Sequence, residues 1–136
     1  MISLALKFGG LLSLLLALGH CTFYRAFGWK QEFAKTSPLA AHVLYTIHVF
    51  LIPFFLIFAY VAFFHTAELA GGTPLGLALS TFYSVFWLAR GLWQVTHLRP
   101  PAEGHIEKLV PLHYGLAVSF FAMATAFALP LASRLP

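Results

Sequence analysis

The residues most capable of chemistry lie between positions 74 and 97, in a stretch that is otherwise apolar. Polar and aromatic side chains recur there at steps of three and four, namely Ser80, Tyr83, Ser84, Trp87, Arg90, Gln94 and His97. On an α-helix this spacing places them on one face, while Val85, Leu88 and Leu92 point elsewhere. A guanidinium in hydrocarbon costs at least about 2.5 to 3.5 kcal/mol unless it is paired or hydrated. This face, and Arg90 above all, is therefore expected to meet other protein rather than lipid.

The histidines are also unevenly distributed. Six of the seven lie near ends of apolar stretches that a chain crossing back and forth would bring to one membrane side, namely His20, His42, His48, His97, His105 and His113. At about 1.5 Å per residue, His42, Gln94 and His113 would lie about 5 Å below the interface. Tyr45, Tyr114 and Arg90 would lie about 8 to 10 Å deep, and His48 and Trp87 about 14 Å deep. We expect these side chains to converge in one half of the membrane.

Two kinds of ligand match these residues. A b-type haem would use imidazoles from facing helices as axial ligands, His42 or His48 with His113, while Arg90 met a propionate. A quinone or similar lipid would accept hydrogen bonds from Arg90, His48 or a tyrosine among Tyr45, Tyr83 and Tyr114, and Trp87 would enclose its ring. The sequence leaves both ligands open and assigns no catalytic residue.

Other interpretations compete with a redox cofactor or lipid site. A histidine-ligated metal centre of a membrane oxidoreductase would draw on His97, His105 and His113, which are spaced eight apart, joined by His20 and His42. The H-x-x-x-H pattern and intramembrane acids expected of such centres are missing from the sequence. In a non-catalytic subunit or assembly factor, the polar face would pack on a partner, and the histidines would anchor helix ends or bond neighbouring helices.

The elements that must position these residues follow from composition. The chain has 136 residues, of which 60% are hydrophobic and 9% charged, and its mean hydropathy is +0.85. A soluble domain of this size could not bury so much apolar surface. We predict transmembrane helices at residues 2–20, 38–65, 74–97 and 106–132, because each is long enough to cross a bilayer core of about 30 Å. The predicted fold is an all-α membrane protein, a single antiparallel four-helix bundle over residues 1–136.

The charges indicate an orientation. The net charge is +4, and five basic residues fall on the two loops of one side, namely Arg25, Lys30, Lys35, Arg99 and Lys108. By the positive-inside rule this side is cytoplasmic, so both termini lie on the other side. We therefore predict a multi-pass protein of a bacterial inner membrane, with the bilayer and further subunits or a second copy as partners and no nucleic acid. Cys21 is the only cysteine, which excludes an intrachain disulfide.

Small residues and helix signals complete the prediction. Close helix contacts are expected along two ridges of mostly small residues, Gly10, Ser13, Ala17 and His20 in the first helix and Gly115, Ser119, Ala122 and Ala126 in the fourth. Ser37 and Pro38 are a typical helix start. Aromatic and charged residues alternate over residues 21–37, which is typical of a segment lying at the lipid headgroups.

Two short motifs carry a resemblance. Phe86-Trp87-Leu88-Ala89-Arg90 is followed by Gln94, and Lys108-Leu109 is followed by His113-Tyr114. In this second half, the chain resembles small uncharacterised bacterial inner-membrane proteins that have four helices. Those proteins carry an F-W-x-x-R segment with a nearby glutamine on the third helix and a histidine early in the fourth. The resemblance implies the four-helix topology and no particular activity.

Overall fold

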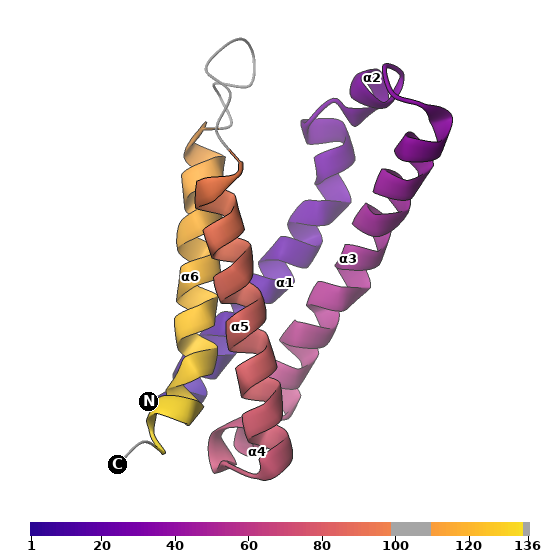
Figure 1. The fold of residues 1–136 in the computed structure, drawn as a ribbon. Coiled ribbons are helices and arrows are strands. Elements are labelled where there is room, and N and C mark those ends of the chain that lie inside the picture. Colours follow the sequence, from indigo (N-terminus) through magenta and orange to yellow (C-terminus); the bar gives the residue numbers. More distant parts are fainter. Residues whose placement is uncertain (99–109, 135–136) are drawn as a thin grey trace.

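A computed structural model of the chain describes residues 1–98 and 110–134, and every regular element within them is an α-helix. The helices are α1 (Ile2–Ala26), α2 (Trp29–Phe33), α3 (Pro38–Phe64), α4 (Thr66–Gly71), α5 (Pro74–Thr96) and α6 (Val110–Ala132) (Figure 1). Four of them, α1, α3, α5 and α6, have 25, 27, 23 and 23 residues and are apolar enough to cross a membrane. The predicted all-α fold with four helices able to cross a membrane is confirmed.

The helix boundaries follow local sequence signals. The hydroxyl of Ser37 accepts a hydrogen bond from the backbone N–H of Ala40 at 3.3 Å, and Pro38 occupies the first helical position, as predicted. Thr73 and Pro74 begin α5 in the same way, with Gly76 as the donor at 3.1 Å. A serine or threonine followed by proline therefore starts two of the four long helices.

The first helix is longer than predicted. It continues past residue 20 to Ala26, because residues 21–26 contain neither glycine nor proline. It stops just before Gly28, whose φ of 62° is left-handed and typical of the residue that ends a helix. The predicted headgroup segment is thus one further turn and a half of α1 followed by the short α2. The helix α4 was not predicted, and residues 106–109 of the predicted fourth helix lie outside the described residues.

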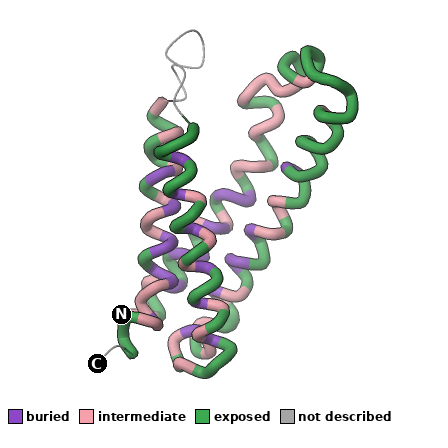
Figure 2. Tube along the Cα trace, viewed as in Figure 1, coloured by how far each residue is buried: buried purple, intermediate pink, exposed green. Residues whose placement is uncertain are grey.

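The four long helices form two pairs, α1 with α3 and α5 with α6. In Figure 1 both termini lie at the end of the molecule that carries α4, which we call the α4 end, and α2 marks the opposite end, the α2 end. The two pairs meet toward the α4 end and diverge toward the α2 end. Buried residues are accordingly concentrated in the α4 half, whereas α2 and the first turns of α3 are exposed (Figure 2).

Helix α1 joins the pairs through small residues. A Cβ added to Gly10 would lie 2.8 Å from the Cβ of Ala62 in α3, and one added to Gly9 would lie 3.0 Å from Phe127 in α6. Ser13 is fully buried one turn later and donates a hydrogen bond to the carbonyl oxygen of Gly9 at 2.9 Å. The predicted small-residue contact of the first helix is confirmed, since both of its neighbours approach at this point.

The equivalent prediction for α6 is wrong in its first half. Gly115 is exposed, and an added Cβ would have no atom within 4 Å. Ser119 donates only within its own helix, to the carbonyl oxygen of Gly115 at 2.8 Å. The reason is the divergence of the pairs, because this part of α6 lies in the α2 half, where α1 has moved away. Ala126, in the α4 half, is buried as predicted.

The two glycines allow a matched test of this arrangement. Replacing Gly10 by alanine forces α1 away from Ala62, and we expect a loss of about 1 to 3 kcal/mol in the free energy of unfolding. Gly115→Ala adds the same methyl group in open space and is expected to stabilise α6 by up to about 1 kcal/mol. Unfolding in mixed detergent micelles, followed by circular dichroism, measures both. Equal effects of the two substitutions would contradict the predicted close approach at Gly10.

Candidate functional site

The polar face of α5 is turned into the protein. Its buried residues are Gly76, Ser80, Tyr83, Trp87, Gly91 and Gln94, which recur at steps of three and four. On the other side of the helix, Val85 is 59% exposed and Leu92 is 49% exposed. The orientation predicted from spacing alone is confirmed for α5 as far as Gln94, whereas His97, which ends the helix, is exposed.

Several polar atoms on this face have no hydrogen-bond partner within the described residues. They are Ser80 Oγ, Trp87 Nε1, Arg90 Nη1 and Gln94 Oε1, and each is shielded from solvent. Buried polar atoms are nearly always satisfied in native proteins, since an unmade bond costs about 1 to 3 kcal/mol. Four such atoms on one helix face are therefore an unusual concentration, and three of them, Trp87, Arg90 and Gln94, lie toward the α2 end.

Arg90 is half-buried against an aromatic ring. Its guanidinium carbon lies 4.6 Å from the ring centroid of Phe120 in α6. Within residues 1–98 and 110–134, an ion pair joins Lys35 to Glu32, and no carboxylate pairs with Arg90. A desolvated cation–π contact is worth about 2 kcal/mol, which is less than the cost of placing the guanidinium in hydrocarbon. Arg90 is thus incompletely compensated by the residues around it.

Trp87 lies at the centre of an aromatic cluster. Its ring is stacked on Phe120 with centroids 5.6 Å apart and on Phe55 of α3 at 5.4 Å. Phe58 and Phe86 meet it edge to face at 5.3 and 4.9 Å. The side chain is fully buried. Its indole N–H is thus held in place by packing on every side and has no acceptor among the described residues.

Gln94 and His113 connect α5 to α6. The side-chain nitrogen Nε2 of Gln94 lies 2.9 Å from Nδ1 of His113. The predicted shared depth of these two residues agrees with this contact. Tyr114, the next residue along α6, is 58% exposed on the outside of the bundle. It therefore does not join the interior face, although it was predicted as a donor.

His48 lies in the other helix pair, and its imidazole already makes a hydrogen bond. Its Nε2 lies 2.8 Å from the carbonyl oxygen of His20. A carbonyl only accepts, so Nε2 carries the proton. The two imidazoles are stacked with centroids 5.1 Å apart, and His20 Nδ1 in turn donates to the carbonyl oxygen of Leu16 at 2.8 Å. His20 was predicted to be an interfacial anchor, and only the depth it shares with His48 could have indicated this pairing.

The remaining predicted residues lie at the surface of the α2 end. His42 is exposed and its Nδ1 donates to the carbonyl oxygen of Pro38 at 2.7 Å, while Tyr45 is 47% exposed and packs on Tyr24. His97 stacks on Trp93, with ring centroids 4.0 Å apart. His105 lies outside the described residues.

The predicted constellation therefore separates into two groups. Trp87, Arg90, Gln94 and His113 come together between α5 and α6, whereas His42, Tyr45 and His48 belong to α3. In the part of the chain that the structure describes, no three His, Cys, Asp or Glu side chains are grouped so as to hold a metal ion. No protein-family model, curated protein or solved structure matches the chain.

The stability of Arg90 variants tests whether the guanidinium lacks a protein partner. In protein freed of bound lipid, we expect Arg90→Met to raise the free energy of unfolding by about 1 to 3 kcal/mol, because an apolar side chain replaces an uncompensated charge. Arg25→Met at the exposed end of α1 is the matched control and should change stability by less than about 0.5 kcal/mol. A destabilised Arg90→Met protein would mean that the guanidinium is stabilised by its surroundings.

Proposed function

We propose that this protein binds the oxygen-bearing head of a quinone-like lipid on the interior face of α5. The observation that carries the proposal is a pair of donors without a partner among residues 1–98 and 110–134, Trp87 Nε1–H and Arg90 Nη1–H, which lie about one helical turn apart and are turned into the bundle. Both groups can only donate hydrogen bonds. The complementary ligand is therefore one that only accepts them, such as a carbonyl oxygen.

The surroundings of the donors favour a flat, apolar ring carrying those oxygens. Phe55, Phe86 and Phe120 surround Trp87 at ring distances of 4.9 to 5.6 Å. Lipid-soluble ligands bind in sites that are mostly aromatic or aliphatic, with a few polar groups fixing their orientation. A quinone ring resting against the outside of this aromatic cluster, with one carbonyl directed at the Trp87 and Arg90 donors, would meet both requirements. Because Trp87 is fully buried, the rings beside it must shift for the carbonyl to reach its N–H.

The same proposal includes the orientation of the protein. Arg25, Lys30 and Lys35 lie at the α2 end, which we take as the cytoplasmic side of a bacterial inner membrane because of the positive-inside rule. The helices then cross the membrane in alternating directions, and both termini lie on the non-cytoplasmic side. Trp87, Arg90 and Gln94 fall in the cytoplasmic half, where a bound quinone could exchange electrons with a partner subunit.

A b-type haem is a second candidate and would use different nitrogens. The proton on His48 Nε2 is committed to the carbonyl oxygen of His20, so haem ligation by that atom would break this bond. His42 is free of this difficulty, because Nδ1 makes its hydrogen bond and Nε2 is available, the arrangement usual for a metal-ligating histidine. A reduced absorption spectrum with haem bands that are lost in His42→Ala and His113→Ala, but kept in His97→Ala, would replace the quinone proposal.

Quinone retention tests the proposal directly. We expect wild-type protein, extracted from quinone-containing membranes in mild detergent, to retain an isoprenoid quinone that lipid mass spectrometry identifies. Arg90→Gln should weaken its binding about 10- to 100-fold, because a hydrogen bond to a charged group is worth about 1.5 to 3 kcal/mol. Trp87→Phe keeps the ring but removes one neutral donor, so we expect about a 3- to 10-fold loss.

Two matched controls accompany these variants. Trp93→Phe alters an indole that is 55% exposed on the lipid side of α5, and Arg25→Gln removes an arginine at the exposed end of α1. Both should retain quinone as the wild type does. If the wild type retained none, or if the controls lost quinone as readily as the α5 variants, the interior face of α5 would not be a quinone site. Co-purification of a specific membrane complex without any lipid would instead favour a non-catalytic subunit.

A further inference from the structure

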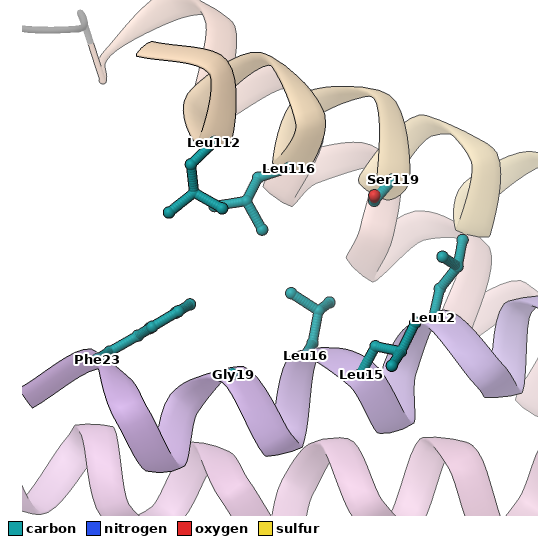
Figure 3. A pocket seen from close by; sticks show the side chains of 8 residues that line it. All are labelled: Leu12, Leu15, Leu16, Gly19, Phe23, Leu112, Leu116 and Ser119. Carbon is teal, nitrogen blue, oxygen red and sulfur yellow. The ribbon is translucent and has the colours of Figure 1, made fainter. Parts of the chain in front are cut away.

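An apolar groove lies between α1 and α6 in the α2 half of the molecule. It has a volume of about 190 Å³, and Phe23 and Leu16 of α1 face Leu112 and Leu116 of α6 across it, while Leu12 and Leu15 lie at the end nearer Ser119 (Figure 3). Its one hydroxyl, on Ser119, already donates to the carbonyl oxygen of Gly115. The groove therefore offers no unsatisfied polar group and suits a hydrocarbon chain.

The groove wall on α6 lies one helical turn from Phe120, the ring that contacts both proposed donors. Leu116, which lines the groove, is followed one turn later on the same face of α6 by Phe120. Phe120 is the ring that carries the Arg90 guanidinium and stacks on Trp87. A ligand held by the two donors thus has this groove as its neighbouring apolar surface.

The opposite route out of the bundle, between α3 and α5, is closed at this level. Phe54 meets Phe86 with ring centroids 5.2 Å apart, and Phe58 meets Phe82 at 6.1 Å. Phe55 stacks on Trp87 on the same side. Side chains therefore fill the α3–α5 contact, whereas the α1–α6 contact opens into the groove.

We propose that the groove between α1 and α6 binds the prenyl tail of the lipid whose head the α5 donors hold, an inference that rests on the proposed function. The tail gains little from the hydrophobic effect there, because the bilayer it leaves is equally apolar. The tail instead contributes packing contacts with the groove walls, and it determines on which side of the bundle the lipid lies. A residue that fills the groove should consequently exclude tailed ligands by steric conflict alone.

Gly19 provides the test. It lies in the groove wall, and an added Cβ would meet only the ring of Phe23, at 3.4 Å, so a larger side chain there projects into the groove without striking backbone. We expect Gly19→Leu to weaken binding of a long-chain prenyl quinone at least about tenfold, while binding of a quinone with no tail changes less than about twofold. If Gly19→Leu does not fold, Ser119→Leu narrows the groove from α6 and carries the same expectation.

Gly71→Leu is the matched control, since Gly71 ends α4, far from the groove, and an added Cβ there likewise has no atom within 4 Å. It should leave the affinity for both quinones unchanged. Unaltered binding of the long-chain quinone in Gly19→Leu would overturn the groove inference and leave the head site standing. Equal loss of both quinones would also overturn it, because the substitution would then act on the head site. Failure of the wild type to bind either quinone would refute the proposed function itself, and the inference with it.

Discussion

The close approach of α1 to α3 and α6 around Gly9 and Gly10 determines the shape of the whole molecule. In a bilayer there is no hydrophobic force between helices, so helices associate where small residues let their surfaces meet. An added Cβ would lie only 3.0 Å from Phe127 at Gly9 and only 2.8 Å from Ala62 at Gly10. This crossing brings the backbones of the two helix pairs together in the α4 half, and aromatic side chains of α3 and α5 also join the pairs. Away from the crossing the pairs separate, and the groove lies where they do so, at the level of the second half of α5.

The most costly polar groups are placed next to the separation rather than within the tightly packed half. Ser80 Oγ has no partner within the described residues in the α4 half, but its hydroxyl is uncharged and rotates to suit its neighbours. Trp87 Nε1 and Arg90 Nη1 have a fixed direction, and the guanidinium also has a charge. If they served only to pack α5 against α6, aliphatic residues would do so at lower cost. Both contact Phe120, one helical turn from the groove-lining Leu116, which is the arrangement that the proposed lipid site requires.

The sequence was sufficient to predict features that depend on a single helix. It was insufficient to predict features that depend on which helices are neighbours. Spacing alone oriented the face of α5, and Ser37 with Pro38 located the start of α3, because both are local properties. Depth counting brought Gln94 and His113 to the same level correctly. Depth does not say which helices are neighbours, however, so His48 was expected beside Arg90 and instead contacts His20. Likewise, small residues permit close approach without causing it: Gly10 has a neighbouring helix and Gly115 has none.

The hydrogen bond between His48 and the carbonyl oxygen of His20 affects how a lipid could enter. It joins α3 to α1 at 2.8 Å in the α2 half, and Trp29 of α2 packs on the same imidazole with ring centroids 4.5 Å apart. In the other pair, Ser84 donates to the carbonyl oxygen of Ala124 and Gln94 contacts His113. Each pair is therefore held by polar contacts within itself, whereas apolar and aromatic contacts join the pairs to each other in this half. Apolar contacts are non-directional and can be exchanged for contacts with a lipid tail without leaving a buried polar atom unpaired. For the lipid of the proposed function, entry between the pairs would therefore cost less than entry within one.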